Sequence, residues 1–321
     1  MNLVYKNICV TGLLVVLPEN ERDFIDDMKM FNFPESRSLK LKEVMGYDKH
    51  RIVQEKTCVS DLAIHGLKHL FNNGSLEKDD FDSLVVVTQS PDHFIPGTSN
   101  VIQGELKLKQ DLFCMDITQG CAGYIVGLMQ AFMLLQQPSV NRVVLINGDV
   151  LSRKVSIHDR NSFPLIGDAV SITIIENKAS DKVYANIKMD GKDRGALSIP
   201  AGGFRMPSNK NTSVLEDVGD GNKRSKDHLR MDGSAVFNFV QSKVPEMVDE
   251  LLDFSKTSLL EIDYFLFHQP NRFMLEKLAD KMKIPYEKMP NNIVEKFGNS
   301  SGVTIPIALA YNLSESVQKE K

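Results

Sequence analysis

The chain alternates between two kinds of apolar run. Short runs rich in β-branched residues predict strands, and longer runs with helical spacing predict helices. The predicted strands are 8–17, 83–89, 112–116, 142–147, 170–176 and 264–268. The predicted helices are 60–71, 122–135, 234–254, 272–282 and one that follows Asn299 and includes 303–313. Strands and helices in alternation predict an α/β fold with a largely parallel sheet.

Two stretches of the chain follow the same order of elements. The first runs from helix 60–71 through strand 83–89, the segment 96–108 and strand 112–116 to helix 122–135. The second runs from helix 234–254 through strand 264–268, helix 272–282 and the segment 293–297 to the helix after Asn299. The shared order predicts two βαβ-type halves, 1–176 and 177–321, with a site where parallel strands end.

The second half is shorter than the repeat requires. After its long helix the first half continues with strands 142–147 and 170–176, whereas the second half stops at Lys321 directly after its helix. Such strands are normally buried in a parallel sheet. We therefore expect the C-terminal half to be incomplete, with one or two strands missing and the chain a fragment or a protein that borrows a covering element.

Composition excludes several classes of protein. Lys and Arg total 38 against 42 Asp and Glu, a formal net charge of −4, which disfavours a general binder of nucleic acid or anionic membrane. The four cysteines form no Cys-x-x-Cys pair, as is typical of a reduced intracellular protein. No apolar run approaches the ~20 residues that span a bilayer. We expect a soluble, cytoplasmic protein without membrane insertion.

Cys121 stands where a predicted strand turns into a predicted helix, in the segment Asp116-Ile-Thr-Gln-Gly-Cys-Ala-Gly123. Unpaired N–H groups and the helix dipole favour a thiolate at a helix N-terminus, but the dipole is worth only ~0.3 to 1 kcal/mol. Strong activation therefore needs a nearby imidazole. The alternative is a small apolar residue at the start of a helix that is apolar on almost every face and hence buried.

His268 and Asn299 supply two further polar groups at predicted strand-to-helix ends. His268 closes the apolar run Tyr264-Phe-Leu-Phe, and Asn299 lies in the Gly/Ser-rich turn before the last helix. A solvated histidine and a helix N-cap are the alternatives. Together with Cys121 they make a nucleophile, an imidazole and an amide donor, a set suited to acyl transfer through a thioester and to stabilisation of an enolate oxygen.

Two other patterns carry weaker hypotheses. His65 and His69 are four residues apart on one predicted helix, but no third ligand with suitable spacing accompanies them, so we assign no metal site. The basic run 223–230 is interpreted as a solvated loop, with a contact to carrier-protein acids or to a coenzyme A phosphate as the alternative.

At these residues the sequence resembles the β-ketoacyl-acyl carrier protein synthase III family. That family's patterns are Asp-x-x-x-x-Cys-Ala-Gly, His-Gln-Ala-Asn and Gly-Asn-Thr-Ser-x-x-x-Ile-Pro. Their counterparts here are Asp116 to Gly123, His268 to Asn271 and Gly298 to Pro306. The resemblance implies a thiolase-like, five-layered αβαβα fold of two pseudo-repeated halves, and a homodimer.

The resemblance also implies roles for single residues. Cys121 accepts the acyl group and its backbone N–H forms part of the oxyanion hole. His268, as a neutral imidazole, and Asn299 hydrogen-bond the carbonyl of a malonyl thioester as it becomes an enolate. Loss of carbon dioxide generates the carbanion, so no metal or redox cofactor is implied.

Two departures from the family pattern follow His268. Pro270 replaces the usual Ala, and the basic residue that helps to dock carrier protein is one position early, as Arg272. We assign Asn271 and Arg272 to carrier or coenzyme A binding.

The predicted function is a decarboxylative Claisen condensation of an acyl thioester, borne by coenzyme A or acyl carrier protein, with a malonyl thioester. One alternative is an acyltransferase of the same fold that passes the acyl group to an oxygen or nitrogen nucleophile. A second is a non-catalytic, carrier-binding partner.

Overall fold

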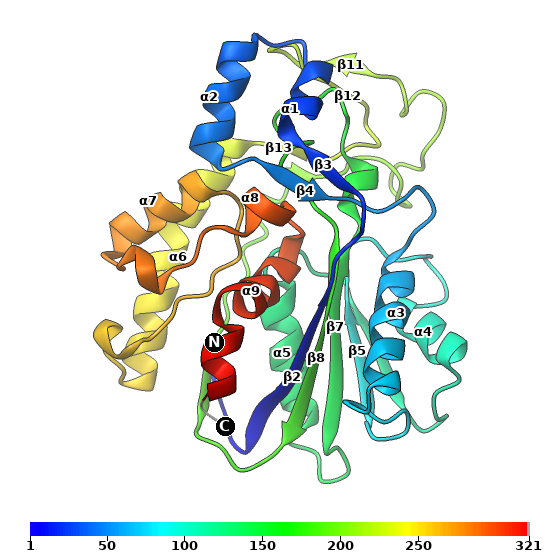
Figure 1. Cartoon of the computed structure of the whole chain (residues 1–321), viewed down its shortest axis with the longest axis vertical. Helices are drawn as coiled ribbons and strands as arrows, with labels where there is room; N and C mark the ends of the chain where they lie inside the picture. The colour runs from blue at the N-terminus through cyan, green and yellow to red at the C-terminus, as the bar shows by residue number, and fades with distance from the viewer. Residues whose placement is uncertain (320–321) are drawn as a thin grey trace.

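The computed structural model describes residues 1–319, and Figure 1 shows a twisted sheet with helices on both faces. The sheet has five strands in the order β2-β8-β7-β5-β6. Their bounds are β2 Ile8–Val16, β5 Ser83–Val87, β6 Phe113–Ile117, β7 Arg142–Asp149 and β8 Ala169–Asn177. β5 runs parallel to β6 and β7, whereas β8 is antiparallel to both β7 and β2. The sheet is thus mixed, with a parallel part that ends at the site.

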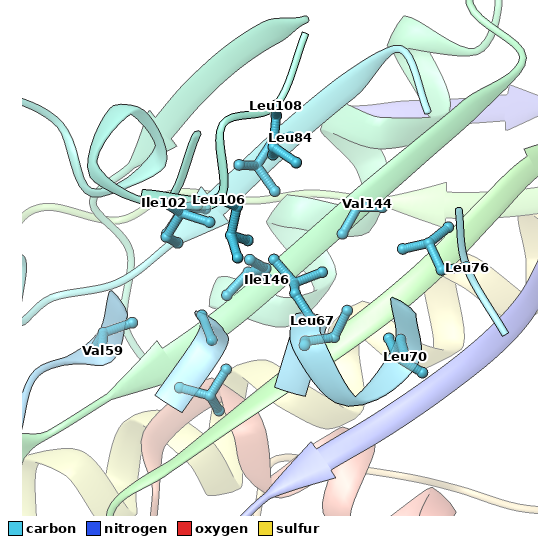
Figure 2. Packing of buried hydrophobic residues seen from close by; sticks show 14 of the residues in the cluster. Val59, Leu67, Leu70, Leu76, Leu84, Ile102, Leu106, Leu108, Val144 and Ile146 are labelled. Atoms are coloured by element: carbon cyan, nitrogen blue, oxygen red, sulfur yellow. The ribbon is translucent and has the colours of Figure 1, made fainter. Parts of the chain in front are cut away.

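Alternate residues of the central strands face opposite sides of the sheet. Leu84 of β5 and Ile146 of β7 pack under α3 (Val59–Asn72) and α4 (Thr98–Leu106), as Figure 2 shows. Val85 and Leu145 point the other way and pack against α5 (Gly123–Leu134) and the first turns of α9 (Thr304–Lys319). This period of two is what a strand buried on both faces requires.

Beyond α5 and α9 lies a further layer, formed by α6 (Gly233–Ser255) and α7 (Arg272–Met282). The segment 264–268 lies between these pairs of helices. Phe265 and Phe267 pack with α6 and α7, while Leu266 packs against the cores beneath α5 and α9. The segment is therefore extended, with side chains that alternate as in a strand.

The strand predicted at 264–268 nevertheless belongs to no sheet among the described residues. A strand is defined by its ladder, and here only isolated bonds form, from the N–H of Phe265 to the carbonyl of Lys288 and from the N–H of Gln269 to the Thr304 hydroxyl. The second sheet of the five-layered arrangement is not formed within residues 1–319. The prediction that strands are missing at the end of the chain concerns Lys321, which lies outside the described residues.

The structure assigns one segment that the sequence left without an element and corrects one further prediction. The segment 293–297, which takes the place of a strand in the repeat, is the helix α8 (Ile293–Phe297), and its adjacent residues Ile293 and Val294 pack into two different cores. Helix α5 is not buried all round, since Ile125 and Met133 are 42% and 44% exposed. The other predicted helices and strands are confirmed to within a few residues.

The remaining elements are short. They are β1 Asn2–Tyr5, β3 Glu21–Asp23, α1 Phe24–Asp27, η1 Met28–Met30, α2 Glu35–Met45, β4 Lys49–Arg51, η2 Leu151–Lys154, β9 Val183–Asn186, β10 Leu197–Ser198, β11 Glu216–Asp217, β12 Lys223–Arg224, β13 Arg230–Met231, η3 Leu259–Glu261, η4 Tyr286–Lys288 and η5 Ser301–Val303. Figure 1 shows α1, α2, β3, β4, β11, β12 and β13 together beyond one end of the sheet. Among the described residues, no helix combines the length and the apolar character needed to cross a bilayer.

Candidate active site

Cys121 occupies the turn between β6 and α5, just before the Ala122 N-cap of the helix. The turn is closed by a hydrogen bond of 2.6 Å from the N–H of Gly123 to the carbonyl of Gly120. The N–H of Cys121 donates to no other residue among those described, so it is available as an oxyanion donor. Cys121 itself is exposed to solvent. The predicted placement of the thiol at a helix N-terminus is thus confirmed.

His268 ends the extended segment and is half-buried. Its Nδ1 atom lies 2.9 Å from the carbonyl oxygen of Ser301 and 2.9 Å from Oγ1 of Thr304. A carbonyl oxygen can only accept, so Nδ1 carries the hydrogen and donates it to Ser301. Nε2 is the nitrogen that remains for Cys121. The ring is therefore held in one tautomer.

Cys121 and His268 interact closely enough that their pKa values move in opposite directions. Desolvation by the surrounding protein pushes the pKa of the Cys121 thiol up, but the charge of His268 and its polar interaction with the thiol outweigh this, and the net shift is downward. Desolvation lowers the pKa of His268, yet the charge of the thiolate and the same polar interaction raise it overall. Both shifts act in the direction of a thiolate facing an imidazolium, which is the direction that activates a cysteine nucleophile.

Asn299 lies in the turn that precedes η5. A parallel bridge joins it to Ile166, with its N–H donating to the carbonyl of Leu165 at 2.7 Å. Its Oδ1 accepts the N–H of Ser301 at 2.9 Å, a capping contact like the one that the sequence suggested. Among the described residues no acceptor is bonded to Nδ2, so the amide retains a donor.

The turn 299–301 joins the candidates, because Ser301 contacts His268 through its carbonyl and Asn299 through its N–H. η5 in turn packs on α5, the helix that Cys121 precedes. The structure thus gathers the sequence-predicted Cys121, His268 and Asn299 around one turn, although they come from three separate segments.

Two polar residues near the pair were missed by the sequence analysis. Asp149 ends β7 and is fully buried, and its charge acts to raise the pKa of Cys121. Gln89 follows β5 and donates from Nε2 to Asp149 at 3.1 Å and to Ser301 at 3.0 Å. Both residues fit the pattern that pointed to His268, in which a polar residue stands at the end of an apolar strand, so the same pattern could have identified them.

Asn271 and Arg272 are engaged within the protein. Asn271 is buried and caps α7, with its Oδ1 accepting the N–H of Met274 at 2.8 Å. Arg272 donates to the carbonyl of Glu43 and lies 3.4 Å from the Glu295 carboxylate. Both therefore support the packing of α7, and their assignment to carrier or coenzyme A binding stays a prediction.

The two weaker patterns lie away from the pair. His65 and His69 are exposed on α3, and no cluster of three or more metal-ligating side chains occurs among the described residues. The basic run 223–230 is largely a loop between β12 and β13, in which Arg224 forms an ion pair of 3.1 Å with Asp159.

Comparison with known proteins adds to this geometry. Residues 115–191 match the family model 3-oxoacyl-[acyl-carrier-protein] synthase III, and residues 252–321 match the model of its C-terminal part. A Campylobacter jejuni protein, provisionally named 3-oxoacyl-[acyl-carrier-protein] synthase 3, is 33% identical over 304 residues, which cover 94% of this chain and 85% of that one. The chain belongs to the 3-oxoacyl-[acyl-carrier-protein] synthase III family.

The solved structures agree with this membership. A 3-oxoacyl-(acyl-carrier protein) synthase from Burkholderia xenovorans is 30% identical with a TM-score of 0.90, and the match covers 99% of this chain and 89% of that chain. A 3-oxoacyl-(acyl-carrier-protein) synthase III is 28% identical with a TM-score of 0.88, covering 97% and 92%. The resemblance and the thiolase-like α/β fold inferred from three motifs are confirmed, and the synthase III family is one of acyltransferases.

Proposed function

We propose that the chain catalyses the decarboxylative Claisen condensation of an acyl thioester with a malonyl thioester, through an acyl group held on Cys121. The observation that carries the proposal is the pairing of Cys121 with His268, in which the pKa of the thiol is lowered and that of the imidazole is raised. Membership of the synthase III family supports the same reaction.

In the first step the Cys121 thiolate attacks the carbonyl carbon of the acyl thioester. The backbone N–H of Cys121 donates to the oxygen as negative charge develops on it. The carbon–sulfur bond of the donor breaks, and the leaving thiolate takes the proton held on Nε2 of His268. The products are acyl-Cys121, a free thiol and a neutral imidazole.

In the second step the malonyl thioester loses carbon dioxide, and the electron pair of the broken carbon–carbon bond becomes an enolate. Asn299 Nδ2 donates to the enolate oxygen. The enolate carbon attacks acyl-Cys121, and the thiolate leaves. Because Nδ1 of His268 donates to Ser301, Nε2 can donate to the enolate only after the imidazole left neutral by the first step has taken a proton from solvent, the one proton that the overall reaction consumes. A neutral imidazole that donates from Nε2, as the resemblance implied, would require the other tautomer.

The proposal includes the substrates and assembly that the sequence analysis expected. The acyl and malonyl groups are borne by coenzyme A or by acyl carrier protein, and the enzyme works as a homodimer. Decarboxylation supplies the carbanion, so the reaction draws on no metal or redox cofactor. Residues 1–176 contribute Cys121, and residues 177–321 contribute His268 and Asn299.

The test is intact-protein mass after incubation with a panel of acyl thioesters and then with malonyl thioester. We expect an acyl adduct on the wild type, its discharge by malonyl thioester with release of a β-ketoacyl product, and no adduct on Cys121→Ser at the same pH. An adduct that malonyl thioester leaves in place would favour transfer to an oxygen or nitrogen nucleophile. No adduct from any thioester would favour the non-catalytic alternative.

A further inference from the structure

Gln89 is a polar side chain that the proposed steps leave unused, and it contacts the chain on both sides of the site, at Gly120 beside Cys121 and at Ser301 beside His268. Its Nε2 donates to Oδ2 of Asp149 at 3.1 Å and to Oγ of Ser301 at 3.0 Å. Its Oε1 lies so close to Gly120 that a Cβ there would be 2.6 Å away. Gln89 therefore touches the residue before the nucleophile and the turn that holds the imidazole.

Asp149 fixes which way the Gln89 amide faces. Its carboxylate is fully buried, and the donors bonded to it among the described residues are all neutral. Instead it accepts from the N–H of Gln89 at 2.7 Å and from hydroxyl groups of Ser90 and Thr88 at 3.1 and 3.2 Å. A carboxylate that only accepts must face Nε2 of Gln89, which directs Oε1 towards Gly120. Burial of such a charge is costly unless donors surround it, so the arrangement is held closely.

Ser301 transmits the position of Gln89 to the reacting groups. Its hydroxyl accepts from Gln89, its carbonyl accepts Nδ1–H of His268 at 2.9 Å, and its N–H donates to Oδ1 of Asn299 at 2.9 Å. A shift of Ser301 would therefore move the imidazole and the amide together. Misplacement of reacting groups by about 1 Å can cost ~100-fold in rate.

We propose that Gln89, oriented by Asp149, is a positioning residue for the condensation: it holds Ser301 so that His268 faces Cys121 and Asn299 faces the enolate. The predicted effect on condensation rests on the proposed function, whereas the predicted effect on the geometry of Cys121 and His268 does not. If Gln89 served only to join β5 to β7, its loss would lower stability without altering the reactivity of Cys121.

The experiment compares Gln89→Met, which fills similar space without hydrogen bonds, with Gln89→Ala and wild type. Single-turnover condensation should fall by about 10-fold to 100-fold with KM little changed, and alkylation of Cys121 by iodoacetamide at neutral pH should slow by about 10-fold. Melting temperature is measured for each variant. The matched control is Gln103→Ala on α4, which removes amide bonds to the carbonyls of Leu108 and Lys109 far from the site and should leave both rates unchanged.

A double-mutant cycle that combines a Gln89 variant with Ser301→Ala tests whether Gln89 acts through the Ser301 hydroxyl. If Gln89 acts through the Ser301 hydroxyl, the double variant should be no slower than the slower single variant, whereas fully additive losses would overturn the proposal. Wild-type alkylation and condensation rates in folded Gln89→Met would also overturn it. Alkylation of Cys121 needs no substrate, so it tests this inference even if the wild type fails to condense. Failure of the wild type to condense would count against the proposed function alone.

Discussion

The Nδ1 atom of His268 lies 2.9 Å from the carbonyl oxygen of Ser301, 33 residues further along the chain. This contact decides the chemistry of the imidazole. Because the carbonyl can only accept, the neutral ring carries its hydrogen on Nδ1 and presents a lone pair from Nε2. Nε2 can therefore take the thiol proton of Cys121, and the lowered pKa of the thiol and raised pKa of the ring agree with that direction.

Cys121 should be the thiol most readily alkylated. Of the other cysteines, Cys114 has a raised pKa because of burial, with a smaller effect from the charge of Asp116. Brief treatment with iodoacetamide at neutral pH, followed by peptide mapping, should label Cys121 at least about 10-fold faster than Cys114. Preferential labelling of Cys9, Cys58 or Cys114 would remove the basis for Cys121 as the nucleophile.

The rate of Cys121 alkylation should rise with pH at values below those of an ordinary cysteine, whose pKa is about 8.5. The thiolate exists above the pKa of the thiol, so a lowered pKa moves the midpoint of the profile to lower pH. His268→Ala removes the two largest influences that lower this pKa, whereas desolvation and the charge of Asp149, which raise it, remain. The midpoint should therefore move upward in that variant.

The control for the pH profile is His65→Ala, which removes an exposed imidazole on α3. Its profile should match that of the wild type. An unchanged midpoint in His268→Ala would mean that the imidazole does not stabilise the thiolate.

Removal of the Asn299 donor should affect condensation far more than acylation. Asn299→Ala should condense on the order of 100-fold to 1000-fold more slowly, as expected for the loss of an oxyanion donor, while Cys121 still accepts an acyl group. Single-turnover measurements of the two half-reactions provide the test.

Asn299→Asp separates the two ends of the amide. It retains an acceptor for the N–H of Ser301 but lacks the Nδ2 donor. We expect it to condense as slowly as Asn299→Ala. Full recovery of the rate in Asn299→Asp would show that Asn299 acts only as a cap.

Gly167→Ala should disturb the backbone that carries Asn299. A Cβ on Gly167 would lie 2.2 Å from the carbonyl oxygen of Phe297, and the Gly167 N–H donates to the carbonyl of Asn299 at 3.1 Å. Neither backbone can yield easily, so denaturant unfolding should show a loss of about 1 to 3 kcal/mol, and condensation should slow. Gly191→Ala, where a Cβ meets open space, should change stability by less than about 0.5 kcal/mol. Equal stability of the two variants would contradict the packing argument.

Much of the fold could be read from local patterns. The predicted strand 142–147 lies within β7, and the predicted helix 272–282 matches α7, because burial on one face or both leaves a periodicity in the sequence. The segment 264–268 shows the limit. Its apolar composition predicted a strand, and the backbone is indeed extended. A strand in a sheet also needs a hydrogen-bonded partner strand, and no local pattern specifies one.

The segment 293–297 shows a different limit. Its apolar residues fit either element, since so short a run cannot distinguish the two periods. The structure shows a helix whose residues Val294 and Ile293 enter two different cores, one that includes Ile166 and one that includes Ile307.

The sequence by itself determined the family, the α/β character and the three candidate residues, because a thiol, an imidazole and an amide in their motifs identify a chemistry without coordinates. Only the tertiary structure decided how they meet. Ser301 orients His268 across 33 positions, and Gln89 reaches Ser301 across 212 and Asp149 across 60. These contacts depend on which strands are neighbours in the sheet and on how η5 packs against α5. Strand order and packing are properties of the assembled core, so no single segment of the chain encodes them.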